Sequence, residues 1–238
     1  MSPSRSLLHS HWQRVVPRPT SERCQHSWVQ MLEVESPSGP ARVYLHGVDR
    51  PRAWLFLGHG AGGGVQAPDL VAAREAALQE RVAVGLVEQP YRVKGRRSPA
   101  PASQLDAAWE AVVSRLRERE LHGLPLLVGG RSSGARVACR TAATTDAVAV
   151  VCLAFPLQPP RRAGKPAAAS RLVELDAVAV PTLVVQGLRD PFGVPPAGGQ
   201  RTVVEVQGDH SLKADLPAVS AAVRSWLAAF FVGRASKM

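Results

Sequence analysis

Cysteine, lysine and aromatic residues are scarce in this sequence. The three cysteines, Cys24, Cys139 and Cys152, are odd in number and form no close pair, which argues against a disulfide framework and against a zinc ligand set. No apolar run approaches the roughly 18 residues of a membrane span, and the N-terminus lacks the continuous apolar stretch of a signal peptide. We therefore expect a soluble cytoplasmic protein with no membrane partner and no bound metal.

The length of the chain limits the number of domains. It has 238 residues, of which 45% are hydrophobic and 20% are charged. Domains usually contain about 100–200 residues, and single α/β domains reach about 250. A chain of this size buries roughly 70% of its unfolded surface, so it needs no metal or disulfide to hold a core. One globular domain is expected, with no cofactor, and the oligomeric state is left open.

The formal charge of +10 could suggest a nucleic-acid partner. However, lysine supplies only four of the 29 basic residues, and the abundance of arginine, alanine, glycine and proline is typical of GC-rich coding sequence. The sequence has no long basic run, and its five Trp and two Tyr offer few rings for base stacking. We therefore expect a small-molecule partner and no nucleic acid.

Residues 1–30 differ from the rest of the chain. They are polar and basic, with Glu22 as their single acid, and they show neither a period of 2 nor one of 3.6. We interpret them as a disordered or loosely attached tail. Met31 then opens the first recognisable strand, so residues 31–238 are expected to form the domain.

From Met31 onward, short apolar runs alternate with segments of helical spacing. This alternation predicts an α/β fold with a mostly parallel central sheet and helices on both faces. No insertion is long enough to form a cap domain. The expected strands are 31–36, 41–47, 53–60, 82–90, 124–130, 147–155, 181–187 and 202–208, and the expected helices are 65–81, 103–120, 132–143, 170–178 and 216–231.

One of these strands ends in a G-x-S-x-G motif, Gly130 to Gly134, which continues directly into a helix. In this context a serine sits on a tight, strained turn that pushes its hydroxyl outward, and side chains two positions away would collide with the turn. The bare motif is weak, since it arises by chance in many chains. Its position between a buried strand and a helix marks Ser132 as a candidate nucleophile.

Two later strands end in the acid and the histidine that such a serine requires. Asp190 follows the strand 181–187, and His210 follows the strand 202–208. Neutral imidazole can accept the serine proton, and an acid then orients the imidazole and stabilises its charged form. Each residue alone could be a plain loop residue, Asp190 an Asx turn before proline and His210 a surface histidine. Their order and their shared sheet edge favour the catalytic interpretation.

The strand 53–60 ends in the glycine-rich segment His59 to Gly64. Serine acyl transfer needs backbone N–H donors directed at the developing oxyanion. The N–H groups of Ala61 and Ser133 are the expected pair. The segment lacks the G-K-[ST] of a phosphate loop and the G-x-G-x-x-G of a dinucleotide site. His59 itself is expected to make structural hydrogen bonds.

Taken together, these segments resemble a known family. HGAGGG, EQPYRVKGRR, GGRSSGAR, LAFPLQPP, QGLRDPFG and GDHSLK, in this order, are similar to the α/β-hydrolase family of small bacterial proteins related to a testis-expressed protein and to a regulatory subunit of the NSL complex. The resemblance covers about residues 31–232. It implies an α/β-hydrolase fold with Ser132, Asp190 and His210 at the triad positions. Dienelactone hydrolase is a more distant relative, and its nucleophile is a cysteine, which argues against a dienelactone substrate here.

Two classes of function remain open from the sequence. The first is a serine hydrolase acting on an ester, thioester or related acyl bond of a small molecule. The second is a non-catalytic interaction protein, because the same family includes eukaryotic members regarded as scaffolds, and fold alone does not certify catalysis. The intact set of three catalytic groups favours the hydrolase.

The loop after the strand 82–90 carries Arg92, Arg96 and Arg97 at the same sheet edge as Ser132. The simpler interpretation is a solvated basic loop on an arginine-rich protein. The alternative is a basic rim that attracts a carboxylate or phosphate on the acyl substrate, because guanidinium groups bind such anions through paired hydrogen bonds.

Overall fold

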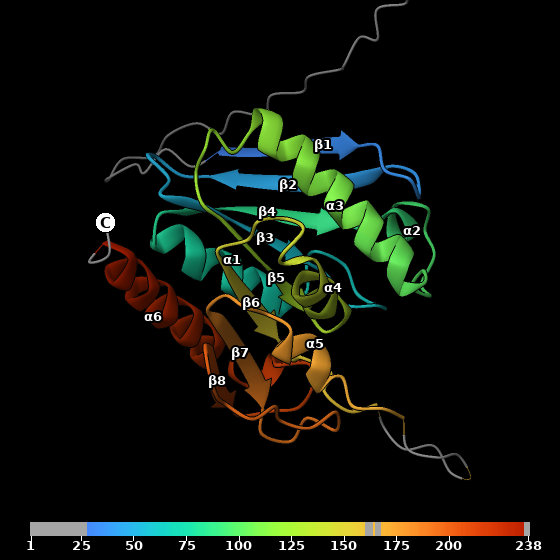
Figure 1. The fold of residues 1–238 in the computed structure, drawn as a ribbon, viewed down its shortest axis with the longest axis vertical. Helices are drawn as coiled ribbons and strands as arrows, with labels where there is room; N and C mark the ends of the chain where they lie inside the picture. The colour runs from blue at the N-terminus through green and yellow to red at the C-terminus, as the bar shows by residue number, and fades with distance from the viewer. Residues whose placement is uncertain (1–27, 160–163, 165–167, 236–238) are drawn as a thin grey trace, which may run out of the picture.

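Eight strands form one sheet at the centre of the molecule, a computed structural model that describes residues 28–159, 164 and 168–235 (Figure 1). The strand order is β1-β2-β4-β3-β5-β6-β7-β8. The pairs β1–β2 and β2–β4 are antiparallel, and all other neighbours are parallel. The strands are β1 (Trp28–Val34), β2 (Ala41–Gly47), β3 (Ala53–Gly58), β4 (Val82–Glu88), β5 (Leu126–Arg131), β6 (Ala149–Leu153), β7 (Thr182–Gly187) and β8 (Arg201–Val206).

Helices cover both faces of this sheet, as the sequence predicts (Figure 1). One face packs against α3 (Ala102–Arg119), α4 (Ser133–Thr141) and α5 (Leu172–Asp176), and the other against α1 (Pro68–Gln79) and α6 (Leu216–Ala235). Within the described residues, the other helical segments are the short α2 (Pro90–Val93) and a 3-10 turn at Lys213–Asp215. Neither forms a cap domain.

The continuous apolar runs follow from burial on two sides. On β3, Trp54 and Phe56 enter the core under α3 and α4, whereas Leu55 and Leu57 enter the core under α1 and α6. Side chains alternate along a strand, so a strand covered on both faces is apolar at nearly every position. Because β3 and β5 lie at the centre of the strand order, the loops after them are held on a rigid base.

The first strand begins earlier than expected. β1 starts at Trp28, three residues before Met31, and the Trp28 ring lies edge-on to Trp54 with centroids 6.4 Å apart. A Cβ on Gly47 would overlap the Trp28 ring, so this glycine makes room for the tryptophan. Of the predicted tail 1–30, residues 28–30 are therefore part of the sheet, and residues 1–27 lie outside the described residues.

Helix α6 also differs from the sequence analysis. Among the described residues, one helical stretch, Lys213–Arg234, has the length and the mean hydropathy, 1.4, of a segment able to cross a membrane. The sequence analysis expected no run of this kind. Its Val219, Val223 and Leu227 form a buried stripe at helical spacing, and the stripe belongs to the core that α1 also lines.

Candidate active site

Ser132 lies on the turn between β5 and α4 with backbone angles of φ 53° and ψ −109°. A positive φ is costly for a residue with a side chain, on the order of 1–3 kcal/mol, and persists only where the surroundings enforce it. Here Gly134 presses against β3: a Cβ on Gly134 would lie 2.3 Å from the carbonyl oxygen of Gly58. Because Gly134 has no side chain, α4 can begin directly against the sheet. This close contact holds Ser132 at the tip of the turn between β5 and α4.

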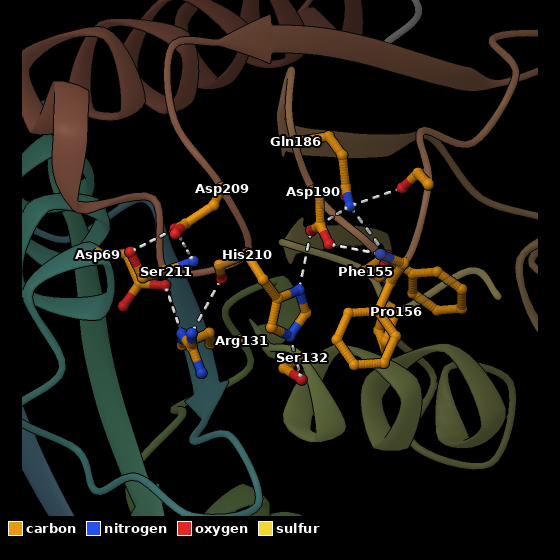
Figure 2. A network of polar contacts seen from close by, with 12 residues as sticks. Asp69, Arg131, Ser132, Phe155, Pro156, Gln186, Asp190, Asp209, His210 and Ser211 are labelled. Atoms are coloured by element: carbon orange, nitrogen blue, oxygen red, sulfur yellow. Dashed lines mark hydrogen bonds and ion pairs between the residues drawn. The ribbon is translucent and has the colours of Figure 1, made fainter. Parts of the chain in front are cut away.

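The structure brings Ser132, His210 and Asp190 together (Figure 2). Ser132 Oγ lies 2.9 Å from His210 Nε2, and His210 Nδ1 lies 2.8 Å from Asp190 Oδ2. With the imidazole proton on Nδ1, His210 donates to the carboxylate and accepts from the serine hydroxyl. The side chain of Asp190 is fully buried. The three residues come from the carboxyl ends of β5, β7 and β8, as the sequence predicts.

Two donors that the sequence analysis did not identify hold Asp190. Gln186, on the buried strand β7, donates from Nε2 to Asp190 Oδ2 at 2.7 Å and also contacts the carbonyl oxygens of Phe155 and Gly193. The backbone N–H of Phe192 donates to Asp190 Oδ1 at 2.9 Å. Hydrogen bonds to the charged form of a carboxyl group stabilise that form. Each carboxylate oxygen of Asp190 therefore accepts one hydrogen bond in addition to the contact with the His210 imidazole.

His59 fastens the glycine-rich loop to the end of β4. The Nδ1 atom of His59 lies 2.8 Å from the carbonyl oxygen of Gly60, and its Nε2 accepts a hydrogen bond from the backbone N–H of Gln89 at 3.1 Å. These partners require the neutral tautomer with the proton on Nδ1. Burial lowers the pKa of His59 further, which keeps the ring uncharged. His59 thus makes the structural hydrogen bonds expected of it.

The same loop is also held from α2. Tyr91 Oη donates to the carbonyl oxygen of Ala61 at 2.8 Å, and burial raises the pKa of Tyr91 to about 12. In the described part of the chain, the backbone N–H groups of Ala61 and Ser133 donate to no other backbone group. Both therefore remain able to donate to a ligand.

The three arginines after β4 lie in the loop that begins with α2. Arg92 is half-buried, and its Nη1 donates to the carbonyl oxygen of Arg96 within the same loop. Arg96 and Arg97 are exposed. Arg96 and Lys94 line a cleft of about 350 Å³ that also reaches Tyr91. The structure brings none of the three arginines into contact with Ser132, Asp190 or His210.

Within residues 28–159, 164 and 168–235, no group of three or more His, Cys, Asp or Glu side chains is placed to hold a metal ion. The buried Cys139 and Cys152 are free thiols with their sulfur atoms 3.5 Å apart.

Comparison with solved structures shows the fold. Three similar structures are a serine hydrolase without a lid, XC6422, from Xanthomonas campestris (19% identity, TM-score 0.62, 83% of this chain and 94% of that chain); dienelactone hydrolase from Anabaena variabilis (17%, 0.66, 84% and 96%); and a hyperthermophilic esterase from Pyrobaculum calidifontis (14%, 0.58, 83% and 83%). They confirm the expected α/β-hydrolase fold. No curated protein matches the chain.

The sequence also matches a family model. The matched segment, residues 51–217, is described as an alpha/beta hydrolase domain. It contains the glycine-rich loop, the serine turn and the loops of Asp190 and His210, and it makes up well over half of the chain. The chain therefore belongs to the alpha/beta hydrolase domain family.

Proposed function

We propose that the protein is a serine hydrolase that cleaves an ester, thioester or related acyl bond of a small molecule. The observation that carries the proposal is the continuous hydrogen-bond chain from Ser132 Oγ through His210 to Asp190, with separations of 2.9 and 2.8 Å. A hydroxyl becomes a competent nucleophile when a neutral imidazole accepts its proton and a carboxylate orients that imidazole.

In the proposed reaction, Ser132 Oγ attacks the acyl carbon while its proton moves to His210 Nε2. The carbonyl oxygen becomes an oxyanion, which the N–H groups of Ala61 and Ser133 stabilise. His210 then gives the proton to the departing alcohol or thiol, and the acyl group remains on Ser132. A water molecule, deprotonated by His210, attacks this acyl-enzyme, and collapse of the second tetrahedral intermediate releases the acid and restores the serine.

The alternative is a non-catalytic interaction protein with the same fold. A binding surface gains nothing from a serine held at φ 53°, or from a fully buried carboxylate directed at an imidazole. Both features cost free energy in the folded state and contribute to catalysis once they act together. They therefore favour the hydrolase over the scaffold. The cytoplasm remains the expected location, and the relation to the testis-expressed and NSL-complex proteins remains an expectation from sequence resemblance.

The proposal is tested by labelling with a fluorophosphonate and by hydrolysis of short p-nitrophenyl esters. Replacement Ser132→Ala should abolish labelling and lower turnover by about 10⁶-fold, because serine, histidine and acid act as a unit. Ser133→Ala is the matched control, since only its backbone N–H has a proposed role; it should keep the label. If wild-type protein is not labelled and hydrolyses no ester, the scaffold alternative is supported instead.

A narrower proposal concerns substrate charge. Arg96 lines the cleft that reaches Tyr91, and Arg97 is the exposed residue next to it in the chain. Tyr91 is in turn bonded to the loop of Ala61. The loop leaves the end of β4, two strands from β5 in the sheet, and extends to the β1–β2 turn, where Lys94 Nζ donates to the carbonyl oxygen of Ser38 at 2.9 Å. We propose that these arginines favour substrates whose acyl group carries a remote carboxylate or phosphate. Arg92, whose guanidinium bonds within its own loop, contributes by holding that loop.

A further inference from the structure

Arg131 occupies the position directly before Ser132 in the G-x-S-x-G motif, and its guanidinium reaches three other segments, of which Figure 2 shows the contacts with Asp69 and His210. Its Nε lies 2.9 Å from Asp69 Oδ2, in an ion pair with helix α1. Its Nη2 donates to the backbone carbonyl oxygen of His210 at 2.9 Å. A Cβ on Gly60 would lie 2.7 Å from Nη1, so the guanidinium also fills the space beside the glycine-rich loop. One side chain therefore contacts α1, the His210 loop and the glycine-rich loop.

Asp69 fixes the guanidinium in place. It is fully buried at the beginning of α1, and its Oδ1 accepts from the backbone N–H of Leu70 at 3.0 Å. Burial raises the pKa of Asp69, whereas the Arg131 guanidinium opposes that rise. A buried carboxylate without a partner is strongly destabilising, and a buried pair adds little net stability. The buried acid is thus better explained by the orientation it gives to Arg131 than by stability.

The loop that carries His210 is held from the side of β7, where the backbone N–H of Arg189 donates to the Gly208 carbonyl oxygen at 2.9 Å. It follows β8, which lies at one end of the strand order and pairs with β7. Within the loop, Asp209 accepts from both the N–H and the hydroxyl of Ser211, which closes a local turn. These bonds shape the loop without tying it to the serine turn. The backbone bond from Arg131 to His210 supplies that link.

We propose that Arg131, anchored by Asp69, is a positioning residue that locks the His210 loop onto the serine turn and so sets the distance between His210 Nε2 and Ser132 Oγ. The inference rests on the proposed function. Arg131 is covalently next to Ser132 and bonded to the backbone of His210, so it links nucleophile and base by a short path. Lysine cannot replace it, because a single ammonium group lacks the planar fork that reaches a carboxylate and a carbonyl in two directions.

The expected cost follows from the sensitivity of proton transfer to geometry. A displacement of about 1 Å at a reacting group can cost about 10²-fold in rate. Replacement Arg131→Lys should therefore lower kcat by about that factor and leave KM nearly unchanged, because the substrate pocket is not altered. Asp69→Asn should act in the same direction with Arg131 still present, since it removes the anchor alone.

The experiment compares Arg131→Lys and Asp69→Asn with Arg52→Lys as the matched control. Arg52 pairs with Glu80 at 3.0 Å at the opposite end of β3, far from the serine turn along the strand. Kinetics on a short p-nitrophenyl ester are combined with thermal unfolding. The proposal requires a selective loss of kcat in the two site variants, with melting temperatures close to that of the control, and unchanged kinetics in Arg52→Lys.

A second measurement separates positioning from general damage. In a His210→Ala background, residual hydrolysis no longer depends on where the imidazole lies, so adding Arg131→Lys should have no further effect. An independent multiplicative loss in that background would overturn the proposal, as would full kcat in Arg131→Lys alone. The NMR resonance of the His210 Nδ1 proton shared with Asp190 gives a readout without substrate: Arg131→Lys should shift or broaden it, and an unchanged signal would contradict the inference. Failure of wild-type protein to hydrolyse any ester would instead reject the proposed function.

Discussion

The serine turn and the two loops that face it reach their geometry by different physical means. At the serine turn, backbone meets backbone, and Gly134 lies so close to Gly58 that even a methyl group would not fit. At Asp190 and His210 there is also a close backbone contact, since a Cβ on Gly187 would lie 2.4 Å from the Asp209 carbonyl oxygen. Here, however, side-chain hydrogen bonds from Gln186 and Arg131 complete the geometry. A steric arrangement fails as a whole when it is changed, whereas a hydrogen-bonded arrangement loses its function by degrees.

The largest effect is expected at the serine turn. Replacement Gly134→Ala would place a Cβ 2.3 Å from the Gly58 carbonyl oxygen and 2.9 Å from that of His59. Neither backbone atom can move away cheaply, so the free energy of unfolding should fall by about 3 kcal/mol, the upper range for an overpacked core. Urea unfolding measures the loss.

Gly62→Ala is the control for that experiment. Gly62 lies in the glycine-rich loop beside the site, but a Cβ there meets no atom within 4 Å. Its stability should match that of the wild type within about 0.5 kcal/mol. Equal losses at Gly134 and Gly62 would show that the tight contact between α4 and β3 does not define the turn.

The acid loop should show the graded behaviour. Replacement Gln186→Leu removes a donor to Asp190 Oδ2 and puts an apolar side chain of similar size in its place on β7. A hydrogen bond to a charged group contributes about 1.5–3 kcal/mol, so turnover should fall by about 10- to 100-fold while the fold persists. Gln200→Leu, which removes an exposed bond to the Ala179 carbonyl oxygen, should leave turnover unchanged. Complete loss of folding in Gln186→Leu would contradict the distinction between the two regions.

The pH dependence of stability tests whether the hydrogen bonds of neutral His59 hold the glycine-rich loop. Burial lowers the pKa of His59, and burial and the charge of Arg74 lower the pKa of His46 to about 4. Protonation therefore favours the unfolded chain, in which histidine titrates near pH 6.5. The stability that neutral His59 contributes is present above that pH and is lost as the pH falls toward the folded-state values.

Urea unfolding at pH 7 and pH 5 measures this loss. The decrease between the two pH values should be smaller in His59→Gln than in the wild type. His46→Gln should also reduce it and serves as a comparison far from the serine turn, on β2. An identical decrease in His59→Gln and wild type would mean that His59 is not held neutral by the fold.

The smallest effect concerns the exposed arginines. Arg96→Ala together with Arg97→Ala should reduce the preference for esters of dicarboxylic acids over neutral esters of equal length by about two- to fivefold in kcat/KM. Exposed charge pairs contribute about 0.2–1 kcal/mol, and salt should weaken the wild-type preference, since the screening length is about 8 Å at physiological ionic strength. Neutral esters should be turned over at the wild-type rate. A wild type with no such preference at low salt would leave the loop without a role in substrate choice.

The sequence predicted the parts of the site that depend on where a residue falls relative to the strands. Ser132, Asp190 and His210 each follow a strand of the parallel part of the sheet, and parallel strands bring such positions to one edge, so their convergence follows from topology. The one-turn helix α2 was expected as loop, because four residues beginning with Pro90 leave no periodic signal. The start of β1 was missed because Trp28 is recognised only by its contacts with Gly47 and Trp54.

The residues that orient the candidate site could not be predicted in the same way. Asp69 and Arg131 are far apart in sequence and meet only because α1 packs beside the end of β5. Gln186 is a single polar residue within an apolar strand, and this pattern does not predict which residue it bonds. Tyr91 reaches the Ala61 carbonyl across two loops. Such pairings depend on side-chain direction in three dimensions, for which no local spacing rule exists.

The position of β8 at the margin of the sheet has a consequence for how the protein loses function. A strand with one neighbour opens at a lower free energy than a central strand, and local opening precedes global unfolding. His210 is carried by the segment that follows β8, whereas Ser132 is carried by β5 between β3 and β6. The proposed base and the proposed nucleophile thus belong to regions of unequal protection against amide exchange. Mild heating should therefore release the base while the nucleophile is still in place, and re-pairing of one strand on cooling should restore the site.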